Sequence, residues 1–269
     1  MPFSSCKPTG TAPLIDLGNS LSQGQIGWWL ANEGAGIRLT NIANRNASSG
    51  TLQSGATWQN SVIGRNLAFD GTATSYVDLG TSPLLAGTTP FTLQWLEFVG
   101  TSPPTFAAVA GFLPSGNTQR FLIFHEDSNA FYTNFNCGLG SAPSISLFAG
   151  APTLASGVGI WRQWILTGTA GMNGVQNTFR LIVDAVDKGT GTAGGTLSSQ
   201  TANLNVLGWD GADSKWKGAL DNFRLWGRVL GNTEIDRLIR NPYDGVRSSA
   251  VRKAGVAGPA GRHRMLLAM

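Results

Sequence analysis

The sequence predicts an all-β protein whose strands are short and joined by many turns. Glycine supplies 36 of the 269 residues, and only 13% of the residues are charged. These fractions argue against a coiled coil or another long-helix protein, which would be rich in alanine, glutamate, lysine and leucine. Nine tryptophans and thirteen phenylalanines supply apolar surface for a core, which argues against a disordered chain. No stretch approaches the roughly 20 apolar residues that span a bilayer.

We expect residues 1–24 to form an irregular arm before the strands begin. This segment is broken up by proline, glycine, serine and threonine, and its opening MPFSSCKPTGTAPLIDLG has one lysine and no apolar run of a signal peptide. We therefore expect synthesis and assembly in a cytoplasm. Cys6 and Cys137 lie too far apart in the sequence to predict a disulfide framework or a CxxC metal site.

Short apolar runs separated by turn signals follow from Gly27 onwards. Their spacing of about 8–15 residues is typical of sandwiches and barrels. The expected strands are Ile26–Leu30, Asn66–Phe69, Tyr76–Leu79, Phe91–Val99, Phe106–Phe112, Arg120–His125, Ala130–Phe135, Trp161–Thr167, Thr178–Val186, Asn203–Leu207 and Gly218–Trp226. No internal repeat of the solenoid or propeller type is present.

Local patterns indicate the faces of these strands and the turns between them. Phe179, Leu181 and Val183 occupy every second position and should share one face of their strand. The pair Asp70-Gly71 is expected to form the tight turn of a hairpin.

One short helix is expected after the last strand. Asn232 can cap this helix, and Asn241-Pro242 would end it. Its shared apolar face would consist of Ile235, Leu238 and Ile239.

The positive charge of the chain is concentrated after residue 244. Residues 245–269 contain no acid, whereas the rest of the chain holds 14 basic and 15 acidic residues. Such a tail can contact an acidic partner, another subunit or nucleic acid, the alternative being a terminus that only adds solubility. The body shows no basic stripe or nucleic-acid motif, so nucleic acid is the least expected of these partners. The basic residues of the tail are Arg247, Arg252, Lys253, Arg262 and Arg264.

A series of motifs resembles one family of β-sandwiches. GWWLANEGAG, LAFDGTATSYVDLG, FTLQWLEF, WRQWILTGT and FRLIVDAVDKGTG occur in order, followed by the closing block WKGALDNFRLWGRVLGNTEIDRLIRNPY. The series is similar to laminin-G-like domains of the concanavalin A-like lectin/glucanase superfamily and covers roughly Gly24 to Tyr243. The resemblance implies a two-sheet antiparallel jelly-roll sandwich over residues 25–244, with the arm 1–24 before it and the basic tail 245–269 after it.

Catalysis is not expected, although glycosidases occur in this superfamily beside lectins and assembly modules. Related laminarinase-type enzymes carry two acids on one strand, but Glu234-Ile235-Asp236 lies on the expected helix and has no second glutamate after it. A pair formed by Glu97 and Glu126 would need the fold to bring these residues together. We expect His125 to be a strand residue on a polar face rather than a catalytic base. A glycoside hydrolase is therefore the third-ranked function. The remaining glutamate and histidine are Glu33 and His263.

We expect no cofactor. The resemblance directs attention to Ca²⁺, and the richest oxygen cluster is the segment containing Asp210 and Asp213. This segment lacks a bidentate glutamate, so the calcium site stays an alternative to turn-forming aspartates. Relatives often carry an aspartate-containing loop at the position of Asn41, Asn44 and Asn46. The replacement of carboxylates by amides further weakens the prediction of a calcium site.

A sugar site is the second functional alternative. Carbohydrate sites place tryptophan or tyrosine rings beside amide and carboxylate groups, and Trp209, Asp210 and Trp216 offer that combination. The tryptophans expected in the core are Trp28, Trp29, Trp95, Trp161, Trp164 and Trp226.

The opening PLIDLGNSLSQGQIGWWLANEGAG, followed at once by the sandwich, resembles laminin-G-like proteins encoded among tailed-phage structural genes. This resemblance implies a non-catalytic virion protein. Capsid decoration or cement is the first expectation, and a tail fibre or adhesin is the next. Its partners would be other virion subunits or copies of itself, reached through the arm and the tail, and not a membrane. The alternative is a lectin module that recognises host surface polysaccharide.

Overall fold

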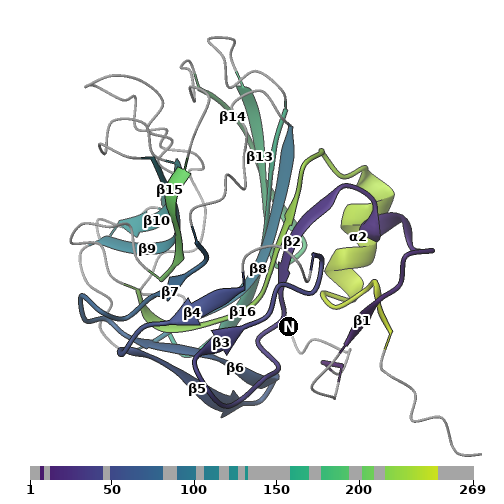
Figure 1. Cartoon of the computed structure of the whole chain (residues 1–269). Coiled ribbons are helices and arrows are strands. Elements are labelled where there is room, and N and C mark those ends of the chain that lie inside the picture. The colour runs from purple at the N-terminus through teal and green to yellow at the C-terminus, as the bar shows by residue number, and fades with distance from the viewer. Residues whose placement is uncertain are drawn as a thin grey trace, which may run out of the picture.

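The computed structural model shows a β-sandwich with a helix packed beside it (Figure 1). It describes residues 7–8, 13–44, 49–80, 90–100, 106–114, 121–126, 131–132, 158–169, 177–193, 202–208 and 216–247. All pairings between named strands in these ranges are antiparallel. The predicted all-β class and antiparallel sandwich are therefore confirmed.

The larger sheet has eight strands, and β16 is its central element. The strands in spatial order are β14 (Val186–Ala193), β13 (Asn177–Val183), β12 (Trp161–Gly168), β8 (Phe91–Val99), β16 (Lys217–Trp226), β6 (Gly64–Asp70) and β5 (Ala56–Ser61). The first part of β16 pairs with β6, and its last part pairs with β2 (Gln25–Trp29). The change of partner coincides with a bulge at Asp221–Arg224, where Asn222 adopts a left-handed φ of 50°.

The second sheet has seven strands, and a short ribbon lies apart from both sheets. The order of the second sheet is β11 (Phe131–Tyr132), β10 (Phe121–Glu126), β9 (Phe106–Pro114), β15 (Ala202–Leu207), β7 (Val77–Asp78), β4 (Gly50–Leu52) and β3 (Arg38–Leu39). The ribbon joins β1 (Leu14–Ile15) to β17 (Val246–Arg247). The helical elements are η1 (Ser20–Ser22) and α2 (Asn232–Arg240).

The main core lies between the two sheets. Phe179, Leu181 and Val183 all point into it, which confirms their predicted common face. The rings of Trp95 and Trp164 stack in this core at 5.9 Å between centroids. Burial of these large aromatic and aliphatic side chains is the main favourable term that holds the two sheets together.

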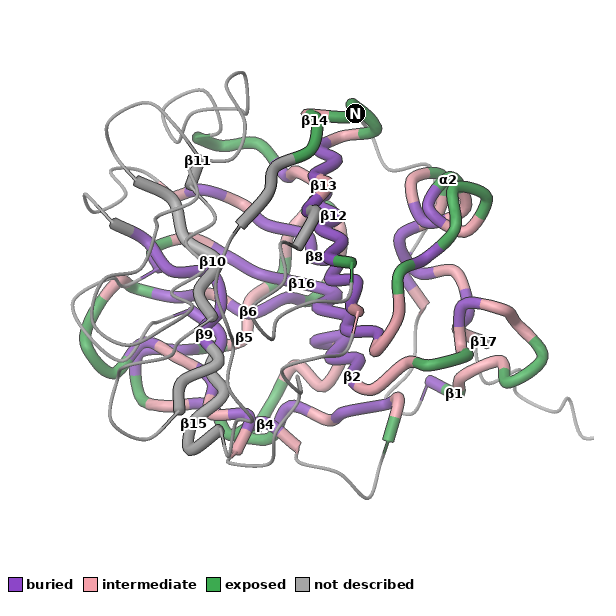
Figure 2. Tube along the Cα trace, turned by 90° about the horizontal axis from the view of Figure 1, so that it is seen from above, coloured by how far each residue is buried: buried purple, intermediate pink, exposed green. Residues whose placement is uncertain are grey.

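The outer face of the larger sheet is also buried, because the arm, η1, α2 and the ribbon cover it. We call these covering segments, residues 13–24 and 227–247, the cap. Figure 2 shows β8, β12 and β16 buried between the second sheet on one side and α2 on the other. Leu21, Trp226 and Leu238 form one apolar cluster under the cap. Trp28 and Tyr243 belong to a second cluster there.

Three local predictions need correction. Asp70-Gly71 does not form a hairpin, because β6 and β7 lie in different sheets and Asp70 Oδ1 instead accepts a hydrogen bond from the Thr72 amide. The single strand expected over 178–186 is a hairpin, since the chain turns at Asp184 and Ala185 with φ of 49° and 68°. The N-cap of α2 is Gly231 rather than Asn232.

Candidate functional site

The predicted sugar patch is only partly described. Trp216 has no exposed surface and belongs to the core between the sheets, while its amide donates to the Gly208 carbonyl at 2.8 Å. Its ring therefore offers no stacking face, which corrects that part of the prediction. Trp209, Asp210 and Asp213 lie outside the described residues.

The glutamates with described side chains take part in contacts that hold the fold. Glu97 is 1% exposed, and its Oε2 accepts from Trp95 Nε1 at 2.9 Å. Glu33 Oε1 accepts from the Thr40 amide at 2.7 Å. Glu97 lies on β8 of the larger sheet and Glu126 on β10 of the other, so the two glutamates are not neighbours on one sheet. His125 occupies β10 as expected.

The asparagines considered for a metal loop include one with a clear structural role. Asn41 is fully buried, and its Oδ1 accepts from the amides of Trp28, Ala43 and Asn44. Asn46 lies outside the described residues. Within the part of the chain that the structure describes, no group of three histidine, cysteine, aspartate or glutamate residues is arranged to hold a metal ion.

The ribbon brings the arm and the start of the tail together. Leu14 pairs with Arg247 and Ile15 pairs with Val246, and the Asp16 amide donates to the Gly245 carbonyl at 2.8 Å. The side chain of Arg247 is not described, and Arg252, Lys253, Arg262 and Arg264 lie outside the described residues. The predicted borders at 24/25 and 244/245 set the arm and the tail apart from the domain. The start of the tail nevertheless pairs with the arm.

A polar cluster joins the arm to α2 and to the turn after it. Arg237 donates to Asp244 Oδ2 and to Asn19 Oδ1, both at 2.9 Å. Asn19 Nδ2 in turn donates to Asp244 Oδ1 at 2.9 Å. Each of the three side chains therefore bonds the other two, which fixes their relative positions.

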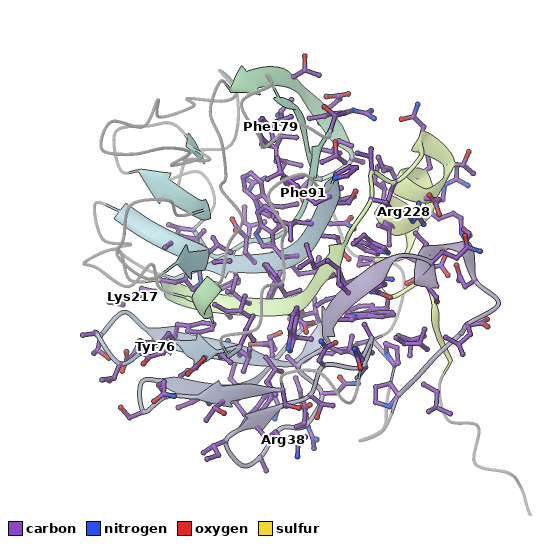
Figure 3. All side chains as sticks on the ribbon, turned by 45° about the horizontal axis from the view of Figure 1, so that its top comes forward. Arg38, Tyr76, Phe91, Phe179, Lys217 and Arg228 are labelled. Atoms are coloured by element: carbon purple, nitrogen blue, oxygen red, sulfur yellow. The ribbon has the colours of Figure 1, made fainter. Side chains whose placement is uncertain are left out.

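A second contact of this kind stands at the start of α2. Arg228 forms a two-pronged ion pair with Glu234, with distances of 2.7 and 2.8 Å, and also donates to the carbonyls of Ser20 and Gln23. Figure 3 shows Arg228 next to α2, on the opposite side of the larger sheet from Phe91 and Phe179. The hydrogen bonds from Arg228 hold the pKa of Glu234 below its usual value.

A buried ion pair attaches the first described residue of the arm. Lys7 Nζ donates to Asp221 Oδ1 at 2.6 Å and to the carbonyls of Ala31 and Arg65, while the Tyr243 hydroxyl donates to Asp221 Oδ2 at 2.8 Å. Burial raises the pKa of Asp221 to about 6, lowers that of Lys7 and raises that of Tyr243. This geometry fits a structural anchor in which the partners of the ammonium are all fixed.

Sequence reasoning missed these anchors for identifiable reasons. Lys7 is one cation within an irregular segment, and no spacing marks it. Asp221 and Arg224 stand among apolar residues of a strand, a pattern that normally indicates a solvent-exposed polar face. The closing block did offer a signal for the anchors, since the polar residues Tyr243 and Asp244 directly follow the expected end of the helix.

Comparison with known proteins supports the fold at the level of sequence. A family model described as "Concanavalin A-like lectin/glucanases superfamily" matches residues 70–236. No curated protein matches the chain. Among the described residues, no helix is long and apolar enough to cross a membrane.

Solved structures with the same architecture come from several kinds of protein. The binding domain of Paraclostridial Mosquitocidal Protein 1 matches with a TM-score of 0.59 and 12% identity, over 82% of this chain and 52% of its own. Domain 4 of AbnA, a GH43 extracellular arabinanase from Geobacillus stearothermophilus solved with arabinotriose, matches with a TM-score of 0.55 and 16% identity, over 80% and 98%. Trypanosoma rangeli sialidase matches with a TM-score of 0.57 and 14% identity, over 88% and 36%. The chain thus spans about half of the first of these and about a third of the sialidase. At these identities the likeness shows the fold alone.

Proposed function

Because the chain belongs to the concanavalin A-like lectin/glucanases superfamily, whose members differ in function, we propose its role from its own architecture. We propose a non-catalytic structural and binding domain of a tailed-phage virion, attached through its terminal segments. Capsid decoration or cement is the position we favour. The observation that carries the proposal is the ribbon in which the arm and the start of the tail pair with each other.

The ribbon gives the two terminal segments a common and firmly held origin. The cap is fastened to the sandwich by hydrogen bonds from Tyr243 to Asp221, from Trp226 Nε1 to the Leu21 carbonyl and from Gln163 to the Leu238 carbonyl. The Arg237–Asp244–Asn19 cluster and Arg228 join the two segments of the cap to each other, and Lys7 ties the residue before the cap to β16. A force on either terminal segment would therefore reach a rigid body rather than a loose loop. This firm attachment of both terminal segments suits a protein that must stay bound to a particle.

The basic tail supplies the chemistry of attachment. Its five cations, four of them arginine, follow a body with nearly balanced charge. Arginine pairs with carboxylates through two parallel hydrogen bonds, so an acidic surface of a neighbouring subunit is a suitable partner. The alternative, a tail that only adds solubility, makes the opposite prediction for the experiment below.

The experiment is a truncation that starts at Ser248. A deletion from Gly245 would also remove β17 and the Gly245 carbonyl that accepts from Asp16, so it would loosen the cap as well. Removal of 248–269 leaves the ribbon intact. We expect the truncated protein to keep its melting temperature and to lose copurification with particles in an infected culture. Copurification at the full-length level would refute attachment through the tail.

A charge-matched pair of variants separates charge from length. In the first variant, the tail residues Arg252, Lys253, Arg262 and Arg264 become glutamine. In the second variant, four body cations become glutamine, so the net charge changes equally: the exposed Arg38, Lys217 and Arg240 and the half-buried Lys188. We expect only the first variant to lose particle binding. Equal losses would point to overall charge rather than the tail.

The second candidate is a lectin module for host surface polysaccharide, which the superfamily membership favours. Trp209 and Asp210 are the residues to test. Trp216→Ala is unsuitable because Trp216 is a core residue and its truncation would destabilise the fold. Polysaccharide binding that is abolished by Trp209→Ala in a protein with an unchanged melting temperature would support the lectin. Binding that survives Trp209→Ala, or no binding by the parent protein, would count against it.

A further inference from the structure

Arg224 is a fully buried cation at the centre of the outer face of the larger sheet. Its guanidinium carbon lies 3.6 Å from the centroid of the Trp28 ring and 4.5 Å from that of Trp226. The indole faces attract the cation and exclude water from it. One end of the group is satisfied, since Nη1 donates to the carbonyls of Pro242 and Asp244 at 3.3 and 3.0 Å.

The other edge of the same guanidinium has no hydrogen-bond partner among the residues that the structure describes. Nε and Nη2 of Arg224 are both buried and neither donates to a protein atom. These two nitrogens form the side of the guanidinium that binds two acceptor atoms in parallel. A Cβ placed on Gly245 would lie 3.6 Å from Nη2, so a side chain at this position would come into contact with that edge.

Gln94 faces Arg224 directly across the strand pair. The two residues are register partners of β8 and β16, so their side chains lie on the same face of the sheet. Gln94 is fully buried, and its Nε2 and Oε1 also lack a partner within the described part of the chain. Two adjacent buried side chains therefore share the same deficit, and buried polar groups are normally satisfied by protein, by ordered water or by an ion.

The chemistry of these atoms selects the occupant. Three nitrogens that donate are opposed by one oxygen that accepts. No described carboxylate pairs with Arg224, since Asp244 is held by Arg237 and Asp221 by Lys7. Burial lowers the pKa of the Arg224 guanidinium well below its ordinary value, with Asp244 opposing that effect. An excess of donors around an unpaired buried cation calls for a negatively charged acceptor.

We propose that the Nε–Nη2 edge of Arg224 and the amide of Gln94 form a buried binding site for one small monovalent anion of halide size. The anion would accept from the guanidinium edge and from Gln94 Nε2, and it would supply the counter-charge that the protein lacks there. Because the site is closed by residues 242–245, binding of the anion would stabilise the cap in its seated position. The proposal does not depend on the virion role.

The first test is thermal denaturation in sodium chloride, sodium bromide and sodium gluconate at one ionic strength. Chloride and bromide should raise the melting temperature in a saturable way, whereas gluconate is too large for the site. At ten times the Kd, the unfolding equilibrium constant should fall about tenfold. That change corresponds to roughly 3–6 °C for a chain of this size. Equal melting temperatures in the three salts would overturn the proposal.

A single-atom change supplies the matched variant. Gln94→Glu places a carboxylate opposite Arg224, so the protein itself would provide the counter-charge and the halide dependence should disappear. Gln59→Glu makes the same change on a half-buried position of β5 and should leave the dependence intact. A Gln94→Glu protein that still responds to halide would contradict the assigned site.

Crystals of the parent protein grown in bromide decide the case even if Gln94→Glu does not fold. We expect an anomalous peak within hydrogen-bonding distance of Arg224 Nε and Nη2. A peak without anomalous signal at that position would identify water alone and would overturn the anion assignment.

Discussion

Lys7 Nζ lies 2.6 Å from Asp221 Oδ1, although the two residues are separated by 214 positions in the sequence. Their side chains are 5% and 0% exposed, so the pair is closed off from solvent. The contact connects the arm to the bulge of β16, where the strand exchanges β6 for β2. Attachment of the arm and shape of the central strand are therefore linked through one ion pair.

Replacement of Lys7 by methionine should destabilise the protein strongly. The change leaves the Asp221 carboxylate buried without its cation, and loss of one partner of a buried pair costs about 3–5 kcal/mol. Urea unfolding at pH 7.5 measures the difference. The exposed Lys217→Met is the control and should change the free energy of unfolding by less than about 0.5 kcal/mol. A Lys7→Met protein as stable as this control would show that the pair contributes nothing.

Asp221 should titrate near pH 6 in the folded protein. Its pKa is raised above the unfolded value of 3.8, so the folded state binds the proton more tightly than the unfolded state does. The contribution of this carboxyl to stability is therefore greatest at low pH and falls as the pH rises from about 4 to about 6. The ¹³Cγ chemical shift of Asp221 followed by NMR gives the midpoint directly. A midpoint at or below 4 would refute the effect of burial.

Loss of the Glu234 carboxylate should weaken the start of α2 and its contact with the arm. Glu234→Ala removes the pair with Arg228 and the bond from the Gly231 amide, and we expect a loss of about 1–2 kcal/mol. Asp236→Ala on the exposed face of the same helix is the matched control. Because the pKa of Glu234 is lowered in the folded state, its contribution should be present above pH 4.5 and decrease in acid. Equal stability of the two variants by urea unfolding at pH 7 would contradict this account.

Gly218→Ala should prevent stable folding. A Cβ at this position would lie 2.1 Å from the Phe98 carbonyl oxygen, and the backbone φ is 155°. The neighbouring atom belongs to the central strand β8 and cannot move away without breaking the sheet. Gly231→Ala is the comparison, since its Cβ would meet nothing closer than Glu234 Oε2 at 3.9 Å. Expression as soluble protein and circular dichroism distinguish the two, and a folded Gly218→Ala protein would disprove the clash.

Ala185→Gly should stabilise the protein by roughly 0.5–1 kcal/mol. Ala185 has a φ of 68° in the turn between β13 and β14, where glycine avoids the penalty of a Cβ. Asp184 should not be changed, because its carboxylate pairs with Arg162 and accepts from the Gln163 amide. Ala68→Gly within β6 has no such φ and should destabilise instead. A lower melting temperature for Ala185→Gly would show that the turn prefers alanine.

The central strands could be predicted because hydrophobic pattern and strand position agree there. The segment Phe91–Val99 was predicted with the bounds that β8 has. Each face of this strand carries apolar residues that pack into a core cluster, as expected for a strand buried on two sides. The short strands β1, β3, β4 and β17 gave no such signal, since two or three residues cannot show a period. The edge strand β5, with the sequence ATWQNS, is too polar to stand out.

The turns and the polar anchors depend on tertiary structure that local patterns do not contain. Asp184-Ala185 lacks the asparagine or glycine that usually marks a tight hairpin, so the expected strand ran through it. Asp70-Gly71 contains the glycine typical of a tight hairpin, but at this point the chain passes from the larger sheet to the second sheet. Arg224 has the alternation of a surface residue and becomes buried only because the cap covers it. Because its surroundings come from Trp28 on β2 and from Pro242 and Asp244 after α2, the sequence around Arg224 carries no local mark of that burial.

The pairing of Leu14 with Arg247 also determines how the protein responds to tension. Since the two strands of the ribbon are antiparallel, the chain enters at Leu14 and leaves at Arg247 from the same end. Tension on the tail would reach the ribbon at Arg247 and open it one residue pair at a time. Tension on the start of the arm would instead reach the buried Lys7–Asp221 pair before it reached Leu14. The two terminal segments therefore resist tension through different contacts, the tail through a two-pair ribbon and the arm through an ion pair with the central strand.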